Sequence, residues 1–392
     1  MTTKIFFIFT HLLVLSCDQA SQHTTQKTSD DLNVVSDTSN SQMNSSLDSI
    51  TTGFIVPVGR MRTARAAHTA TLLRNGQVLI CGGFSGNTLS SAEIYDPSSK
   101  IFETVGQMSV ARAGHSATLL PDGKVLIAGG YNGNYLSSTE IFDPQTKTFS
   151  AGPLMNLSRS EHTANLLNNK KILFAGGVGV DWSFLESSEL YDIQTKTFSP
   201  TGSMTTARES HTATLLKNGN VLITGGHKGR RADIEIYSSA EIYNPISEKF
   251  RLIGNMSHIR HKHDAVMLAD GRVLISGGSD ERDSRGTYSS AEIFDPVSSI
   301  FKPVKNMNLT HYKHNTTSIL LKNNKVLIAG GADRAEIYDP ESGKFTMVMG
   351  SMGTQRLFAR ATLLSNGQVL ITGGYNENQE ASANAWIYDF KR

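Results

Sequence analysis

The chain has 392 residues, and its 37 basic and 35 acidic side chains leave a formal net charge of +2. This balance argues against a general nucleic-acid-binding protein, which usually carries a clear basic excess, so we expect no nucleic-acid partner. The two cysteines, Cys17 and Cys81, are too few for a disulfide framework.

The N-terminal residues have the composition of an export signal. Lys4 precedes an apolar run over residues 5–15 that is too short to span a bilayer but suits the hydrophobic region of a signal peptide. The run ends in Leu-Ser-Cys at residues 15–17, which resembles the lipobox of bacterial lipoproteins. We predict a signal peptide over residues 1–16 and lipidation at Cys17. The exported protein would then be anchored to a membrane, in the periplasm or at the cell surface; a cleaved signal and a secreted protein are the alternative.

Residues 17–52 are rich in Ser, Thr, Asn, Asp and Gln and contain no aromatic side chain. Such a segment cannot bury enough apolar area to offset the entropy lost on ordering it. The sequence therefore predicts a disordered tether between the membrane anchor and a folded domain over residues 53–392.

A pair of adjacent glycines recurs along the folded part of the chain at intervals of about 50 residues. The pairs are Gly82-Gly83, Gly129-Gly130, Gly176-Gly177, Gly225-Gly226, Gly277-Gly278, Gly330-Gly331 and Gly373-Gly374. This period is typical of solenoids and propellers, in which each repeat is one structural unit.

Each repeat contains four short segments that favour β-strands. In the second repeat these segments are residues 115–120, 125–128, 138–143 and 148–150. The second of them is apolar throughout, which is typical of a strand buried on both faces. A four-stranded sheet of this kind needs neighbours on both sides, and a ring of stacked sheets supplies them.

The two ends of the folded domain complement each other. Residues 54–61 match the fourth strand of a repeat, whereas the chain ends with a segment, residues 386–389, that matches a third strand. We therefore predict an all-β, seven-bladed β-propeller in which the N-terminal strand completes the last blade and removes the exposed sheet edges.

The repeat resembles the kelch family in its bacterial form. The resemblance is carried in the first repeat by Ala64-Arg65, His68, residues 70–73, Gly76 and residues 78–83, and it extends over about residues 54–389. It implies the propeller fold, and kelch-type propellers commonly bind partners through one face of the ring.

The same superfamily contains galactose oxidase, a copper radical enzyme whose tyrosine is joined to a cysteine. In this chain Cys81 stands inside a repeat strand, where the other repeats have Ala, Ser or Thr. We interpret Cys81 as a small buried side chain and predict no metal and no cofactor.

Three polar residue types recur at fixed positions in the repeat. The arginines are Arg65, Arg112, Arg159, Arg208, Arg260 and Arg356; the histidines are His68, His115, His162, His211, His263 and His314; the glutamates are Glu93, Glu140, Glu189, Glu241, Glu292 and Glu336. A catalytic group is normally singular, whereas buried polar groups usually have partners. We interpret these residues, with the glycine pairs, as a hydrogen-bonded scaffold.

The loops after the glycine pairs differ in length, being longest in the fourth and fifth repeats and almost absent in the sixth. The candidate rim residues on these loops and the neighbouring corners are His227, Lys228, Arg230, Arg231, His258, His261, Asp280, Arg282, Arg285, His311 and Lys313. Uneven loops on a rigid ring often carry function, so we interpret this rim as a surface that binds a protein or a glycan. A plain solvated surface is the alternative.

Two further interpretations concern the same face. A metal site could be built from His258, His261, His263 and His311, but their spacing has no zinc signature. The loop aromatics Tyr131, Tyr135, Trp182 and Tyr375 are candidate contacts that could stack on sugar rings or anchor their own loops.

No phosphate-binding loop, nucleophile elbow or zinc-protease helix occurs in the sequence. We therefore expect a non-catalytic, membrane-tethered recognition module whose partner is a protein or a glycan. A carbohydrate-active enzyme of the oxidase, epimerase or sialidase-like kind is the alternative.

Overall fold

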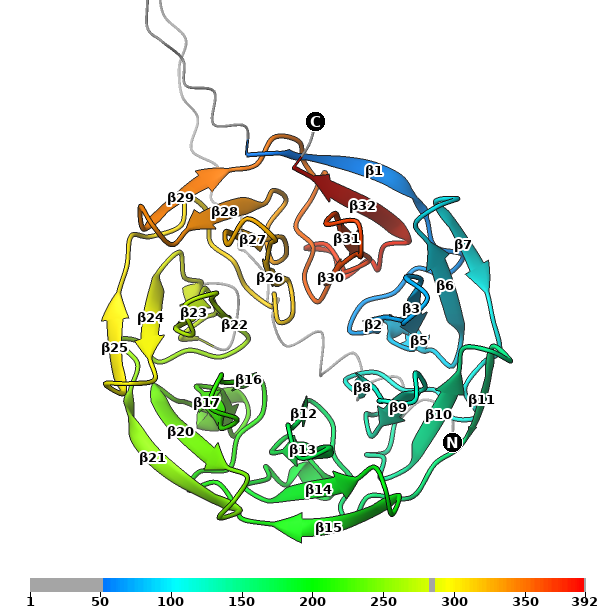
Figure 1. Ribbon diagram of the computed structural model, residues 1–392, viewed down its shortest axis with the longest axis horizontal. Helices are drawn as coiled ribbons and strands as arrows, with labels where there is room; N and C mark the ends of the chain where they lie inside the picture. The colour runs from blue at the N-terminus through cyan, green and yellow to red at the C-terminus, as the bar shows by residue number, and fades with distance from the viewer. Residues whose placement is uncertain (1–51, 282–285, 391–392) are drawn as a thin grey trace, which may run out of the picture.

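The computed structural model describes residues 52–281 and 286–390. Seven four-stranded antiparallel sheets form a ring around a central axis (Figure 1). The predicted all-β, seven-bladed propeller is thereby confirmed. The segments predicted as signal peptide and tether, up to residue 51, lie outside the described residues, as do Arg282 and Arg285.

The first four blades are given from the axis outward. Blade one contains β2 (Thr69–Leu72), β3 (Val78–Cys81), β6 (Ala92–Asp96) and β7 (Ile101–Thr104); blade two contains β8 (Ser116–Leu119), β9 (Val125–Ala128), β10 (Thr139–Asp143) and β11 (Thr148–Ala151); blade three contains β12 (Thr163–Leu166), β13 (Lys171–Ala175), β14 (Ser188–Asp192) and β15 (Thr197–Thr201); blade four contains β16 (Thr212–Leu215), β17 (Val221–Thr224), β20 (Ser239–Asn244) and β21 (Lys249–Asn255).

The remaining blades follow the same order. Blade five contains β22 (Asp264–Met267), β23 (Val273–Ser276), β24 (Ala291–Asp295) and β25 (Ile300–Pro303); blade six contains β26 (Ser318–Leu320), β27 (Val326–Ile328), β28 (Glu336–Asp339) and β29 (Lys344–Met347); blade seven contains β30 (Arg360–Leu363), β31 (Val369–Thr372), β32 (Asn384–Asp389) and β1 (Phe54–Arg60). In blade seven β1 is antiparallel to β32, with Phe54 opposite Asp389 and Arg60 opposite Asn384, so the two ends of the described chain share one sheet (Figure 1).

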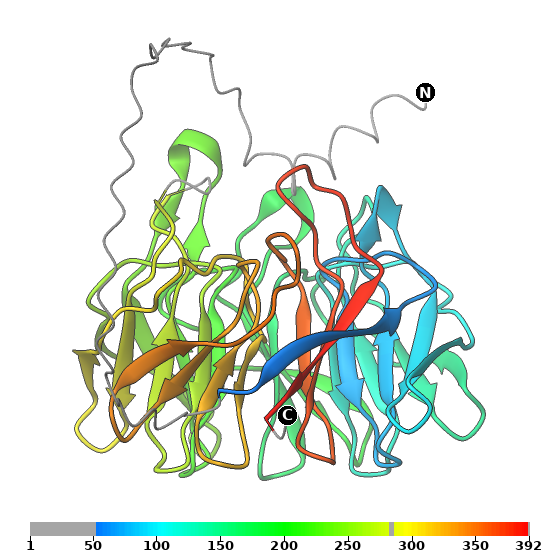
Figure 2. The same ribbon diagram turned by 90° about the horizontal axis from the view of Figure 1, so that it is seen from above.

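The loops that follow the second strands project on one side of the ring, which we call the loop face. Two of them form small hairpins, β4–β5 (Phe84–Ser85 and Asn87–Thr88) and β18–β19 (His227–Lys228 and Glu235–Ile236). Short 3-10 turns lie in the loop after β13, as η1 (Val180–Trp182), and between β18 and β19, as η2 (Arg231–Asp233). Figure 2 shows the β18–β19 hairpin and the loop before β32 rising on the same side.

The apolar core lies between neighbouring blades. Leu79 and Cys81 of β3 pack in one cluster with Val125 and Ile127 of β9, and all four side chains are fully buried. Each buried aliphatic side chain of this size contributes about 1.5–3 kcal/mol, so stacking second strands face to face stabilises the whole ring.

One backbone hydrogen bond recurs at every junction between blades. The N–H of Gly83 donates to the carbonyl oxygen of Arg112 in the next blade at 2.9 Å, and the N–H of Gly374 closes the ring onto Arg65 at 3.0 Å. The other donor–acceptor pairs are Gly130–Arg159, Gly177–Arg208, Gly226–Arg260, Gly278–His311 and Gly331–Arg356. At Gly83 the positive φ of +96° and the approach of the Ala66 oxygen, 2.6 Å from where a Cβ would lie, both require glycine.

Among the described residues, no helix has the length and apolar character needed to cross a bilayer.

Candidate ligand site at the mouth of the central channel

The repeated arginine and glutamate form a buried ion pair that fixes the corner entering each first strand. In blade one Arg65 Nη2 lies 2.8 Å from Glu93 Oε1, and Arg65 Nη1 donates to the Gly82 oxygen at 2.7 Å. Glu93 also accepts the backbone N–H groups of Arg62 at 2.6 Å and Thr63 at 3.0 Å. The same pairing recurs as Arg112–Glu140, Arg159–Glu189, Arg208–Glu241 and Arg260–Glu292.

Blades six and seven depart from this pairing. In blade six His311 takes the arginine position, with Nδ1 bonded to the Gly330 oxygen at 2.5 Å and Nε2 at 3.3 Å from Glu336 Oε1. In blade seven Trp386 occupies the glutamate register, and the Arg356 guanidinium lies 4.9 Å from the centre of its ring.

The repeated histidines join each blade to the preceding one. His68 Nε2 lies 2.9 Å from Thr372 Oγ1 of blade seven, and His162 Nε2 lies 2.9 Å from Ser116 Oγ of blade two. Burial lowers the pKa of His162 to about 3, and a neutral imidazole is the form that suits this dry position.

The first strands surround a central pocket of about 430 Å³. Most of its lining side chains are Thr, Ser, Asn and Ala, and three are charged: Glu161, Asp264 and Arg360. Asp264 and Arg360 occupy the strand position that is Thr69 in blade one and is uncharged in blades two to four as well. This pocket therefore contains charges that belong to single blades.

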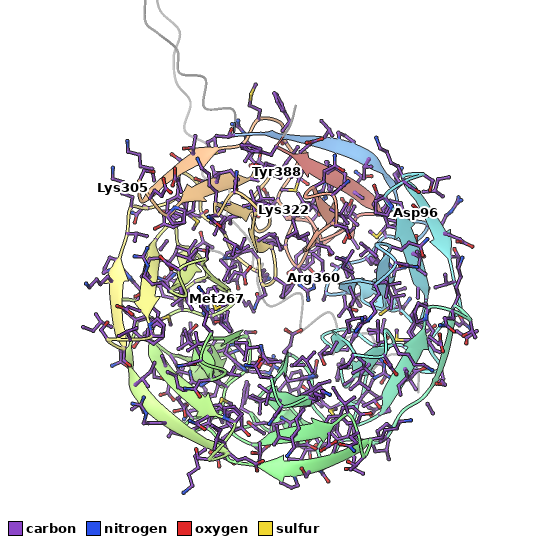
Figure 3. The ribbon with its side chains drawn as sticks, in the orientation of Figure 1. Asp96, Met267, Lys305, Lys322, Arg360 and Tyr388 are labelled. Atoms are coloured by element: carbon purple, nitrogen blue, oxygen red, sulfur yellow. The ribbon has the colours of Figure 1, made fainter. Side chains whose placement is uncertain are left out.

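Arg360 is held by backbone carbonyl groups from three blades. Its Nε–H donates to the His68 oxygen at 2.7 Å, and Nη1 donates to the oxygens of Asn315 at 3.1 Å and Ala359 at 3.2 Å. Nη2 makes no hydrogen bond with the described residues, and Figure 3 shows Arg360 near the middle of the ring. Burial lowers the pKa of Arg360, whereas Glu161 and Asp264 act in the opposite direction.

The two acidic side chains of the pocket differ in the number of hydrogen bonds that they accept. Asp264 Oδ2 accepts the N–H groups of Thr317 at 2.8 Å and Ser318 at 2.7 Å, and Oδ1 accepts that of Ala265 at 2.9 Å. The Glu161 carboxylate accepts no hydrogen bond from the described residues, and burial together with the charge of Glu209 raises its pKa. Glu161 is therefore the carboxylate that can meet a ligand.

The mouth of the pocket on the loop face is formed by a ring of corner residues, which we call the corner ring. Its members are Ala67, Gly114, Glu161, Ser210, Lys262, Lys313 and Phe358, all with positive φ between 51° and 61°. Backbone bonds link successive members, as from Glu161 N–H to the Gly114 oxygen at 2.9 Å and from Phe358 N–H to the Lys313 oxygen at 2.7 Å. A left-handed conformation costs a non-glycine residue about 1–3 kcal/mol, so the surrounding packing must hold these side chains in place.

A buried polar cluster borders this mouth. Glu209, only 4% exposed, lies 3.0 Å from His227 Nε2 and 3.4 Å from Arg230 Nη2. The Arg230 guanidinium stacks over Trp182 at 3.8 Å from the ring centre. Although burial alone would raise it, the contact with His227 lowers the pKa of Glu209 to about 2.

Glu209, His227 and His261 lie in a row in this cluster and can form a continuous chain of hydrogen bonds when one additional proton is present. His261 Nε2 faces the Glu281 carbonyl oxygen at 3.0 Å and must donate to it, and His261 Nδ1 lies 3.1 Å from His227 Nδ1. If His261 is neutral, its Nδ1 accepts a hydrogen bond from the Nδ1–H group of His227. His227 Nε2 then carries no hydrogen of its own, so it can bond Glu209 only if the His227–Glu209 pair holds an additional proton. A charged His261 requires the same additional proton, so all three contacts are hydrogen bonds only when the chain of side chains holds it, and burial, which lowers the pKa of His227 and of His261, opposes this.

The structure brings some of the sequence-predicted rim residues together and separates others. His227, Arg230 and His261 share the buried cluster, and Lys313, 3% exposed, donates to Tyr375 Oη at 2.7 Å. The other rim residues lie elsewhere: Lys228 and His258 are exposed, Asp280 accepts a hydrogen bond from Tyr288, His311 belongs to the blade-six scaffold, and Arg231 lies in η2. Their role in partner binding stays a prediction.

Three of the four predicted aromatic contacts form one stack beside the cluster. The ring centres of Tyr131 and Tyr135 are 4.9 Å apart, and those of Tyr135 and Trp182 are 5.8 Å apart. Sequence reasoning missed Glu161, Glu209 and Arg360. The sequence contained a signal for Arg360, because Arg360 and Asp264 are the charged residues at a first-strand position that is Thr or Ser in the other repeats.

Matches to the kelch motif, together with the seven-bladed ring, support a kelch-repeat β-propeller. The kelch motif matches residues 65–109 and 111–156, which cover blades one and two. No curated protein matches the sequence.

Among solved structures, 1088 chains match, so the fold alone selects no function. One of them, described as a novel fungal alcohol oxidase of the AA5 family in complex with copper, is 16% identical with a TM-score of 0.69, over 86% of this chain and 76% of that one. This likeness shows the fold.

The copper named for that oxidase does not fit the donors found here. Within residues 52–281 and 286–390, no three His, Cys, Asp or Glu side chains are grouped so as to hold a metal ion. Cys81 is buried in β3 beside Thr69 and His115, and burial raises the pKa of its thiol. We derive no copper chemistry for this chain.

Proposed function

We propose that the protein is a non-catalytic recognition module that binds the end of a glycan in the central pocket, through its mouth on the loop face. The observation that carries the proposal is the pocket lining of Thr, Ser, Asn and Ala side chains with one free carboxylate, Glu161, and one guanidinium edge, Arg360. Sugars present many hydroxyl groups, and a concave polar pocket can satisfy them. The core of a protein–protein interface is, by contrast, enriched in apolar and aromatic side chains.

The aromatic side chains beside the mouth support the same choice of partner. Trp182 and Phe184 are half-buried on the loop of blade three, and Arg230 lies over both rings. A wall of this kind offers apolar contact to a sugar ring while the pocket provides hydrogen bonds.

The test is to screen the full chain against a glycan array and to measure the affinity of each hit by titration calorimetry. Glu161→Gln keeps the shape of the side chain but removes its charge, and we expect it to weaken binding by about tenfold. Lys147→Gln, in an exposed ion pair with Glu103 on the outer strands, is the matched control and should bind as the wild type does. Absence of any bound glycan, or unchanged affinity in Glu161→Gln, would overturn the proposal.

A carbohydrate-active enzyme is the second candidate function. It is favoured by the buried Glu209–His227–His261 chain, because general acid–base catalysis uses carboxylate and imidazole side chains in contact beside a ligand pocket. If it holds, a bound glycan is converted to product, and Glu209→Gln abolishes turnover while leaving the affinity for the glycan in place.

We also propose that Cys17 carries a lipid that tethers the propeller to a membrane, since the cysteine ends an apolar leader and precedes a long polar segment. Cys17→Ser should move the protein from the membrane fraction to the soluble fraction of its host. Retention in the membrane fraction would contradict the lipid anchor.

A further inference from the structure

The central pocket holds two opposite charges that act on each other through space but are not in direct contact. No hydrogen bond or ion pair among the described residues joins Glu161 to Arg360, although both line the same pocket. Asp264, the third charged side chain, already accepts three backbone N–H groups. The cation and the remaining carboxylate are therefore both left to interact with something else.

Arg360 is not required by the repeat. The equivalent side chains Thr69 and Thr212 serve as hydroxyl partners for the repeated histidines, and blade seven has Ala359 where its own histidine would be. Arg360 thus replaces a small scaffold hydroxyl by a guanidinium whose Nε and Nη1 are fixed to carbonyl groups. A half-buried guanidinium with an unpaired edge is unfavourable unless a ligand or water meets it.

The mouth above the pocket has a positive balance. Lys262 and Lys313 belong to the corner ring, Lys262 Nζ lies 3.4 Å from Tyr312 Oη, and the charges of Lys262 and Arg230 act on Glu161. The opposing carboxylate of Glu209 is already in contact with His227 and Arg230. Such a distribution of charge attracts anions toward the channel.

We propose that the ligand is a glycan whose terminal sugar carries a carboxylate, as in a hexuronic acid. The carboxylate binds the free Nη2 edge of Arg360, and Glu161 accepts hydrogen bonds from hydroxyl groups of the same sugar. This assignment rests on the glycan-binding function proposed above and adds the chemical class of the ligand. Hydrogen bonds between charged partners are about twice as strong as neutral ones, so the carboxylate distinguishes the ligand from its uncharged analogue.

The experiment uses pairs of sugars that differ in the carboxylate alone. The full chain is titrated with galacturonate against galactose and with glucuronate against glucose, and we expect the acid to bind at least about tenfold more tightly in one pair. Arg360→Gln should abolish this preference, and Arg360→Lys should keep part of it. Lys147→Gln, in the exposed pair with Glu103 on the outer strands, is the matched control and should keep all of it.

A second variant keeps the test valid if Arg360→Gln fails to fold. Glu161→Gln should weaken the acid and the neutral sugar by the same factor, leaving the preference unchanged. If the neutral sugar binds as well as the acid, or if a folded Arg360→Gln keeps the preference, the carboxylate assignment is wrong while glycan binding stands. If neither sugar binds, or if free amino acids bind in their place, both proposals fail.

Discussion

Two glycines in the loop after β3 separate the effect of close packing from that of backbone conformation. Gly83 and Gly86 both have positive φ, +96° and +74°, so alanine at either position costs about 1–2 kcal/mol from the left-handed backbone. Removing a glycine also restricts the unfolded chain, but this effect is the same for both and cancels in their difference.

The two positions differ in what an added Cβ meets. At Gly86 nothing lies within 4 Å, whereas at Gly83 the Cβ would lie 2.6 Å from the Ala66 oxygen and 2.8 Å from His68 Cβ. Relieving that contact moves the Gly83 N–H away from its 2.9 Å bond to Arg112. Overpacking costs about 1–3 kcal/mol and the weakened bond about 0.5–1.5 kcal/mol, so Gly83→Ala should be less stable than Gly86→Ala by about 2–4 kcal/mol.

The assay is urea unfolding of the full chain, monitored by circular dichroism. The free energies of unfolding of the two variants are compared using one common dependence on urea concentration. Equal loss of stability in the two variants would refute the reasoning, because it would mean that backbone conformation alone accounts for the glycine at position 83.

Two further predictions use the same unfolding assay. Arg208→Met leaves Glu241 buried without its 3.0 Å ion pair and should lower the free energy of unfolding by about 3–5 kcal/mol. Lys147→Met, at the exposed pair with Glu103, should lower it by less than about 1 kcal/mol. Similar losses in the two variants would contradict the structural role of the buried pair. Burial lowers the pKa of His162, His211 and His314 to about 3, from 6.5, so protons bind the unfolded chain first. The free energy of unfolding should therefore be highest above about pH 6.5 and should fall toward pH 3, by about 1.4 kcal/mol per pH unit for each histidine. In His162→Gln this dependence on pH should be smaller by the contribution of one histidine. An unchanged slope would show that His162 is not held neutral.

The fold could be predicted because its signals are periodic. A Cβ at the first glycine of a pair would touch the corner of the next blade, as at Gly82, where it would lie 2.6 Å from the Arg112 oxygen. The second strand is buried on both faces, as in β3, and both features repeat with the blades. A repeat period can be recognised even when the bounds of a single strand are slightly wrong, so the number of blades could be predicted from the sequence.

The candidate site could be predicted only in part, because its residues depend on side-chain direction. Loop length and additional histidines pointed to the rim, yet His261 and His311 turn inward and are fully buried. Whether Arg360 faces the axis or the adjacent blade depends on the register of β30, which a one-residue shift would reverse. Glu161 reaches the pocket because its corner has a left-handed backbone, which nothing in a single glutamate indicates.

The backbone bonds between blades give the ring a redundancy that its side chains alone would not provide. In blade six the corner arginine is replaced by His311, yet the Gly278 N–H still reaches that residue's carbonyl oxygen at 2.8 Å. Replacing the repeated side chain thus changes the buried ion pair but leaves the backbone bond across the junction in place. A blade that departs from the shared pattern can therefore remain part of the ring and carry a residue of its own, as blade seven does with Arg360 next to Ala359.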